Sequence, residues 1–290
     1  MSAQNRKVNR KTGFWSDAWK RLRRNRAAMF SLVVLTLLVI SAVFAGAIAP
    51  YSYSAQDYDN LFQPPSPAHP FGTDNFGRDI LSRIIYGSRI SLLVGFSSII
   101  TAIIAGGILG AVSGYYGNKI DNSIMRVMDI LMAIPGMLLA ISLAATLKPG
   151  LINMVIAIAI ADIPGYSRVV RASVLTIKGQ EYIEAAQCIG ASDRRIIFRH
   201  VLPNCMAPII VQATLGMAGA ILSASSLSFL GLGIQPPTPE WGSMLASARQ
   251  YIREYWHMTA FPGLAIVITI FALNILGDGL RDALDPRFRR

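Results

Sequence analysis

Few side chains in this sequence are of the types that do chemistry, and they lie far apart. The chain has 3 His, and His69, His200 and His257 are too scattered for one to serve as the partner of another. Cys188 and Cys205 do not have the spacing of a metal or redox site. The sequence also lacks the Gly-x-x-x-x-Gly-Lys-Ser/Thr loop that binds nucleotide phosphates. We therefore expect no catalytic residues, no bound metal and no nucleotide site in this chain.

The elements that carry these side chains are long and apolar. Hydrophobic residues make up 53% of the chain and charged residues 15%, whereas a typical soluble domain has about 25% charged residues. Crossing a bilayer as a helix takes about 20 apolar residues. Six stretches meet this requirement, at residues 28–49, 91–113, 123–147, 151–174, 205–231 and 258–277. The predicted fold class is an all-α polytopic membrane protein with six transmembrane helices.

The basic residues predict the orientation of these six spans. The formal net charge is +11, from 27 Lys and Arg against 16 Asp and Glu. Placing both termini in the cytoplasm puts 21 of the 27 basic residues on the inside and 6 on the outside. Cytoplasmic loops are enriched in Lys and Arg, so this orientation is favoured. This orientation explains the positive net charge without any nucleic-acid partner.

The segments around the spans complete the predicted organisation. In the basic tail, Trp15, Trp19 and Leu22 would share one face of an interfacial helix that contacts membrane lipid. The predicted segments are a cytoplasmic tail with this helix (1–27), a first span (28–49), an outer loop with a short helix (50–90), a five-helix core (91–277) that contains an inner loop (175–204) and an outer loop (232–257), and a cytoplasmic tail (278–290).

Two acidic side chains stand inside or near the spans. Asp162 lies near the middle of the fourth span, two residues before Pro164. A carboxylate is costly in lipid, so it should face other helices or a wet cavity. There it could meet a cationic group of a substrate, or bond to backbone freed by Pro164. Asp129 lies one turn from Arg126, and we expect a local ion pair between them.

Small residues recur at every fourth position in two spans. They are Ala102, Gly106, Gly110 and Gly114 in the second span, and Gly216, Ala220, Ala224 and Ser228 in the fifth. This spacing lets helices approach closely, so tight packing is the first expectation. The fifth span also carries hydroxyl groups that could line a path through the membrane. With Asp162, the candidates for such a path are Ser223, Ser225, Ser226 and Ser228.

The inner loop between the fourth and fifth spans has its own amphipathic pattern. An apolar stripe at helical spacing is formed by Tyr182, Ala185, Ala186 and Ile189. Gly190 is placed to end this helix in a left-handed conformation. Ser192 could cap a second short helix, and Pro203 would end it. Such a helix pair could pack on the protein's own spans or insert into a groove on a partner.

The same loop resembles a known motif. Glu184, Ala185, Ala186 and Gly190, followed by Leu202 and Pro203, have the spacing of the EAA loop of ABC importer permeases, although His200 replaces the usual aliphatic residue. The resemblance implies that this loop is a coupling helix that docks in a cleft of an ATPase subunit. It also implies that large side chains at Ala186 or Gly190 would block the docking.

A second resemblance lies on the outer side. Residues 70–79 read P-F-G-T-D-N-F-G-R-D and are similar to the signature of the dipeptide/oligopeptide/nickel permease family; residues 228–233, 235–242 and 276–286 fit the same family. The signature residues are Gly72, Thr73, Asp74, Gly77, Arg78 and Asp79. Locally they form a glycine-rich turn before an amphipathic helix, with an expected Asp79–Arg83 ion pair. We expect this segment to be a structural plug.

These resemblances imply a fold, a function and a set of partners. The fold would be that of a type I ABC importer permease, and the chain is most similar to the "C" member of the paired permeases. The partners would be a second homologous permease, two ATPase subunits that bind ATP and Mg, and an extracytoplasmic solute-binding protein. The location would be a bacterial or archaeal inner membrane, and this chain would bind no cofactor.

The substrate and the energy source leave alternatives open. Members of the family carry dipeptides, oligopeptides, nickel or glutathione, and the absence of a His or Cys cluster favours peptides over a bare metal ion. A secondary transporter driven by an ion gradient would need charged or unwound sites at the midplane, and only Asp162 supports one. A membrane enzyme would need clustered ionisable groups, and none are evident.

Overall fold

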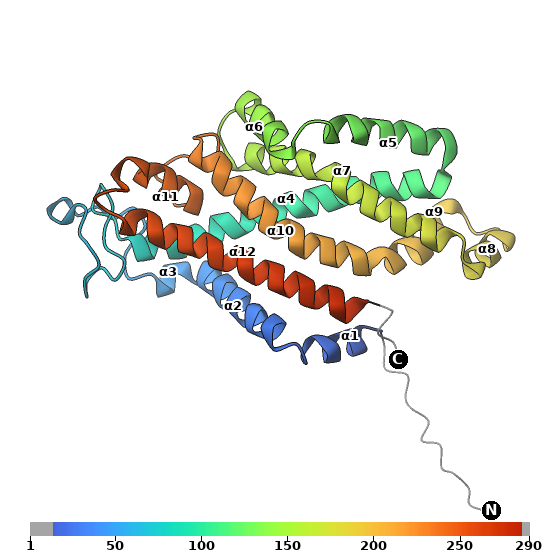
Figure 1. Cartoon of the computed structure of the whole chain (residues 1–290), viewed down its shortest axis with the longest axis horizontal. Coiled ribbons are helices and arrows are strands. Elements are labelled where there is room, and N and C mark those ends of the chain that lie inside the picture. Colours follow the sequence, from blue (N-terminus) through green and yellow to red (C-terminus); the bar gives the residue numbers. More distant parts are fainter. Residues whose placement is uncertain (1–13, 286–290) are drawn as a thin grey trace, which may run out of the picture.

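The computed structural model describes residues 14–285 and shows a bundle of long helices that run between two ends of the molecule (Figure 1). One end carries the outer loops and α11, and the other carries α8 and α9. The long helices are α2 (Arg26–Val43), α4 (Ile80–Tyr116), α5 (Asn118–Met132), α6 (Gly136–Leu147), α7 (Leu151–Lys178), α10 (Met206–Phe229) and α12 (His257–Leu284). Shorter helices are α1 (Phe14–Leu22), α3 (Ala45–Ile48), α8 (Glu181–Cys188), α9 (Asp193–Ile196) and α11 (Trp241–Ala248).

Five helical segments are long and apolar enough to cross a membrane, and α5 with α6 would make a sixth span. This pair differs from the straight third span that the sequence suggested, because α5 and α6 meet at a bend of 86°. Pro135 explains the bend: it has no N–H to donate and disfavours helical geometry at the residue before it. Gly136 then starts α6 in a new direction.

The second span is longer than the apolar stretch that predicted it. α4 runs without a break for 37 residues, which corresponds to about 55 Å. The short helix expected in the outer loop is therefore the first part of α4. Asp79 is the N-cap of α4, and its side chain accepts a hydrogen bond from the Ser82 N–H at 2.7 Å. The span and its outer extension thus form one rigid element.

The small-residue stripe of α4 packs directly against α7. A Cβ built on Gly106 would lie 2.7 Å from the carbonyl oxygen of Ile163, and one on Gly110 would collide with the backbone of Ser167. Gly114 approaches Val174 in the same way. Tight helix packing, the first expectation for this stripe, is confirmed. Around it lies the main apolar core, which includes buried residues of α4, α6, α7 and α10.

The interfacial helix predicted near the N-terminus corresponds to α1. Its Ala18 and Leu22 are buried, and Leu22 clusters with Ala28 of α2 and Ala283 of α12. Trp15 and Trp19 are about half exposed at 55% and 47%. The predicted shared face is therefore divided, with Leu22 directed into the protein. Residues 1–13 of the tail lie outside the described part of the chain.

We predict that Gly110→Ala destabilises the protein by about 1–3 kcal/mol, because the added methyl group must displace the α7 backbone. Gly107→Ala is the matched control in the same helix, since its Cβ would meet nothing within 4 Å. Thermal unfolding in detergent should show a lower Tm for Gly110→Ala only. Equal Tm values for the two variants would contradict close α4–α7 packing.

Candidate functional site

The inner loop forms a compact projection beyond the end of α7 (Figure 1). α8 ends at Cys188, and Gly190 has a φ of +78°, so the predicted left-handed conformation is confirmed. This conformation is strained for most other residues. A Cβ at Gly190 would meet no atom within 4 Å, so the glycine is required by the backbone turn and not by crowding within this chain.

The two faces of α8 have different surroundings. Ile183 and Ala186 are buried in a cluster with residues of α4, α7 and α9. Tyr182, Ala185 and Ile189 point outward, and Ile189 is 85% exposed. The single apolar stripe predicted from the sequence is therefore two surfaces. One is used within the chain, and the other leaves apolar side chains uncovered.

The position of Ala186 changes its expected role. Its side chain is only 7% exposed and contacts the protein's own core, so a large residue there would first disturb α8 itself. Glu184 and Ala185, in contrast, are both exposed. Of the motif residues in α8, Glu184 and Ala185 are therefore the ones available to a partner. Ile189, directly after α8, is exposed as well.

Side-chain bonds tie the loop to the membrane helices. The Tyr115 hydroxyl of α4 donates to Asp193 Oδ1 at 2.8 Å, and Lys178 Nζ of α7 donates to the Tyr115 carbonyl at 2.6 Å. The Ser192 side chain makes no capping bond to α9, contrary to expectation. The loop is thus connected to both α4 and α7.

The second half of the loop continues into the fifth span. After α9 the backbone passes through a π-helical turn and a 3₁₀ turn that contains Leu202 and Pro203, and then enters α10. Pro203 lies in the first turn of the 3₁₀ element, directly after the π-helical turn, so its missing N–H coincides with the change in helix type. The prediction that Pro203 ends the helix was wrong: Asp193 to Phe229 form one near-continuous helical segment.

The candidate path residues do not form one cluster. Ser228 is buried and its hydroxyl donates to the Met154 sulfur at 3.7 Å, which is a contact inside the core. Ser225 and Ser226 line a groove of about 450 Å³ between α10, α11 and α12. Ser223 and Asp162 are each half-buried.

The acidic residue of α5 has a different partner from the one expected. Asp129 pairs with Arg168 of α7 at 2.5 Å, not with Arg126. Arg168 is 39 positions away in the sequence, so the local spacing could not show it. A second pair, Asp121 with Arg171, joins the same two helices at 2.6 Å. These bonds fasten the inner half of α5 to α7.

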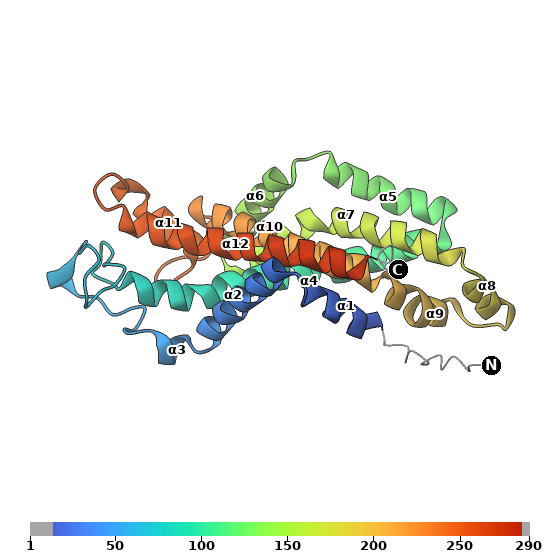
Figure 2. The same cartoon turned by 60° about the horizontal axis from the view of Figure 1, so that its bottom comes forward.

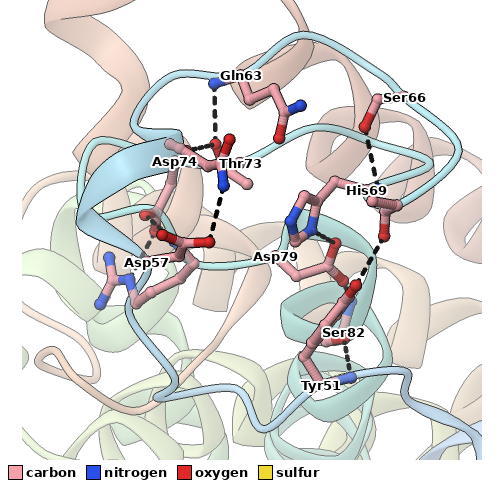
Figure 3. Close-up of polar contacts among 12 residues, drawn as sticks. Tyr51, Asp57, Gln63, Ser66, His69, Thr73, Asp74, Asp79 and Ser82 are labelled. Atoms are coloured by element: carbon pink, nitrogen blue, oxygen red, sulfur yellow. Dashed lines mark hydrogen bonds and ion pairs between the residues drawn. The ribbon is translucent and has the colours of Figure 1, made fainter.

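The outer signature forms a hydrogen-bonded cap over the start of α4 (Figure 3). The Thr73 hydroxyl accepts from the Gln63 N–H at 2.8 Å, and the Ser82 hydroxyl of α4 accepts from the Tyr51 N–H at 3.0 Å. Gly72 and Gly77 have positive φ angles of 77° and 68°. A Cβ on Gly77 would collide with the backbone of Asp57. These glycines are therefore required for the shape of the cap.

Buried charges hold the same cap together. Asp74 pairs with Arg78 at 2.6 Å and lies 3.7 Å from Arg83, and the side chains of both arginines are at most 6% exposed. Asp79 pairs with His69 Nδ1 at 2.9 Å while it caps α4 (Figure 3). The expected Asp79–Arg83 pair is thus replaced by Asp74–Arg83. These contacts hold the cap together, and its role as a structural plug stays a prediction.

Glu240 is a buried residue that the sequence analysis did not single out. It caps α11 by accepting hydrogen bonds from the Gly242 and Ser243 N–H groups at 2.9 and 2.8 Å, and Ser91 of α4 donates to it at 3.3 Å. Burial raises the pKa of its carboxyl, whereas these bonds act to lower it. The sequence does contain a signal for this capping role, because Glu240 is an acidic residue directly before the apolar run that starts at Trp241.

Comparisons with known proteins agree with this geometry. Residues 103–290 match the family model of the binding-protein-dependent transport system inner membrane component. Residues 13–65 match the N-terminal transmembrane domain of oligopeptide transport permease C. A solved structure of the MetNI methionine ABC transporter aligns with a TM-score of 0.58 at 17% identity, covering 70% of this chain and 96% of that one.

Curated relatives are much closer in sequence. The chain is 50% identical to a di/tripeptide transport system permease protein of Pseudomonas aeruginosa, over 94% of this chain and 92% of the relative. It is 48% identical to a dipeptide transport system permease protein of Alkalihalophilus pseudofirmus (95% and 90% covered). It is also 48% identical to a glutathione transport system permease protein of Escherichia coli (95% and 91% covered).

The fold is that of a type I ABC importer permease, a multi-span membrane protein. The chain belongs to the family of binding-protein-dependent transport system inner membrane components. Its role is that of a permease subunit of a bacterial ABC importer, and the family-level interpretation of the sequence is confirmed.

We predict that Asp74→Ala loosens the outer cap, since it leaves Arg78 and Arg83 buried without a counter-charge. Breaking a buried ion pair in this way costs about 3–5 kcal/mol. Limited proteolysis from the outer side should then cut the cap faster than in the wild type. Asp59→Ala, at an exposed position nearby, should leave the cutting rate unchanged. Equal rates for both variants would show that the ion pairs do not hold the cap.

Proposed function

We propose that this chain, with a second homologous permease, forms the translocation path of an importer for di- and oligopeptides. The observation that carries the proposal is the α8 surface: an uncovered apolar face on a loop that is bonded to two membrane helices. The names of the relatives at 48–50% identity support the substrate class. Glutathione, the substrate named for a third relative, is itself a tripeptide, so it falls within the same chemical class.

In the coupling step, the loop would transmit movement from an ATPase subunit to the membrane helices. Glu184, Ala185 and Ile189 present one charged and two apolar side chains at the surface, which suits insertion into a cleft of an ATPase subunit. ATP and Mg would be bound by two such subunits and not by this chain. Movement of α8 would be passed to α4 and α7 through Tyr115 and Asp193.

The arrangement of the two ends of the bundle supports the remaining proposed partners. α8, α1 and the end of α12 lie toward the same end of the bundle, which we assign to the cytoplasm of a bacterial inner membrane (Figure 1). Both termini would then be cytoplasmic, in line with the excess of Lys and Arg there. The opposite end carries the cap and α11, where an extracytoplasmic binding protein would deliver the solute. Asp162, Ser223, Ser225 and Ser226 stay candidates for the path.

We predict that uptake of a labelled dipeptide into cells lacking this chain is restored by the wild type and lost in Ile189→Asp. The new carboxylate would have to be buried without a partner if α8 docks in an apolar cleft. A charge left unpaired in a buried interface costs about 2–5 kcal/mol. Copurification of the ATPase subunits with the variant should fall in parallel.

A control and a second docking variant separate docking from folding. Asn122→Asp adds the same charge at an exposed inner position on α5 and should keep full uptake. Gly190→Asn keeps the left-handed conformation, which Asn tolerates, but adds a side chain at the proposed docking surface, so its uptake should fall. Normal uptake by Ile189→Asp would refute the assignment of the loop. Restoration of nickel uptake but not dipeptide uptake by the wild type would refute the substrate class.

A further inference from the structure

Asp162 is a carboxylate without a partner in the membrane-spanning part of the chain. It lies near the middle of α7, its side chain is half-buried, and it makes no hydrogen bond or ion pair with any described residue. The acids of α5 differ, because Asp121 pairs with Arg171 and Asp129 with Arg168. A charged group at this depth faces protein, a ligand or a wet cavity and not lipid. The cation that balances Asp162 is therefore missing from the part of the chain that the structure describes.

The face of α7 that carries Asp162 is left open by its neighbours. α7 runs beside α5 and α10 (Figures 1 and 2), and the glycine stripe of α4 packs on a third side. Tyr166 points toward α10, where its hydroxyl donates to the Gln212 carbonyl at 3.2 Å, and Arg168 reaches α5. Asp162 shares its face instead with Gly165, three residues later. A Cβ on Gly165 would meet nothing within 4 Å, so no described helix covers this face.

α10 has an open position at the same depth. A Cβ on Gly216 would collide with the Tyr166 hydroxyl, so Gly216 of α10 and Tyr166 of α7 lie level with each other. Asp162 is one helical turn, about 6 Å, further toward the outer end. Because the two helices run in opposite directions (Figure 1), the matching turn of α10 is the one after Gly216, which contains Gly219. Gly219 is exposed, and a Cβ there would also meet nothing within 4 Å.

The open face continues toward a cavity at the inner end of the bundle. Val169 lies seven residues after Asp162, two turns further along the same face of α7. It lines a cavity of about 810 Å³ together with Gln212 of α10 and Arg281 of α12, which give the wall polar groups. This is the end at which an importer would release its solute. Asp162 therefore lies above the cavity, on the route that such a solute would follow.

The groups at this site suit one compact cation. Within the residues that the structure describes, no cluster of His, Cys, Asp or Glu could hold a metal ion, so a metal is not the balancing charge. A free peptide carries an N-terminal amino group, which is largely protonated at neutral pH. A carboxylate binds the resulting ammonium group through charge-assisted hydrogen bonds. Gly165 and Gly219 then leave room for the rest of the peptide, since neither has a Cβ.

We propose that Asp162 binds the N-terminal ammonium group of the peptide as it passes through the membrane, in the open space beside Gly165 and Gly219. This inference rests on the proposed function, since it takes the peptide from there. Every peptide with a free N-terminus has this group, whatever its side chains are. A carboxylate in the path thus recognises the whole class of substrates without selecting a sequence.

Thiol labelling of the whole complex in lipid nanodiscs tests the charge at this site. Gly219→Cys places a thiol in the open space, and Cys188→Ser removes the exposed natural thiol. A cationic and an anionic methanethiosulfonate reagent are compared by their labelling rates. We expect Asp162→Asn to lower the ratio of the cationic to the anionic rate by about 10-fold, because it removes a unit charge close to the thiol. Asp129→Asn removes the same charge from an acid already paired with Arg168, so it should leave the ratio nearly unchanged.

A second measurement identifies the ligand. With ATP and the binding protein present, a dipeptide should slow the labelling of Gly219→Cys, and this protection should disappear when Asp162→Asn is added. Uptake of the dipeptide into cells should fall about 10-fold in Asp162→Asn, since a charge-assisted hydrogen bond is lost. Asp162→Glu, which keeps the charge, should recover most of the uptake. A purely structural role would change neither the labelling ratio nor the protection.

The outcomes separate this inference from the proposed function. An unchanged ratio in Asp162→Asn would overturn the inference, because a basic residue of the second permease would then already neutralise the carboxylate. A Gly219→Cys thiol that neither reagent reaches would also overturn it, since lipid or protein would cover the face. If the wild type imports the dipeptide but the dipeptide gives no protection, the peptide is not the ligand and only this inference fails. If the wild type imports no dipeptide, the proposed function fails as well.

Discussion

The close approach of α4 and α7 is the constraint on which the rest of the structure depends. Glycines at every fourth position of α4 bring its backbone against that of α7, so side chains of ordinary size cannot be inserted between them. The two helices therefore pack as a single unit. α8 follows directly from α7, and Tyr115 of α4 holds the start of α9 through Asp193. A loop without these two attachments could bind a partner but could not pass a movement to the spans.

The outer end is fixed by a second set of contacts that use the same helix. α4 extends beyond its apolar stretch, and Asp79 caps it there while pairing with His69. Glu240 joins α11 to α4 through Ser91, and Trp241 donates to the Ile84 carbonyl at 3.1 Å. α4 thus connects the inner loop with the outer cap, so events at the two sides of the membrane can be linked through one rigid helix.

Much of this could be predicted from the sequence, because the governing patterns are local. Apolar length predicted the spans, the four-residue spacing of glycines predicted close packing, and Gly190 predicted a left-handed turn. Several of the errors concern partners that are distant along the chain. Arg168 is 39 positions from Asp129, and Glu240 is 149 positions from Ser91, so no local spacing reveals either contact. The sequence predicted a single apolar surface on α8. Periodicity shows which residues share a face of a helix, but not which face the rest of the protein covers.

The central claim is that the outward face of α8 is covered by an ATPase subunit in the working transporter. Cys188, a natural thiol, is exposed next to that face, and Cys205 is buried and serves as an internal control. The most direct measurement is the rate of maleimide labelling of Cys188 in inside-out membrane vesicles, with and without the ATPase subunits. We predict rapid labelling of the permeases alone and strong protection in the full complex, with Cys205 unreactive in both. Equal labelling of Cys188 in the two preparations would contradict the account.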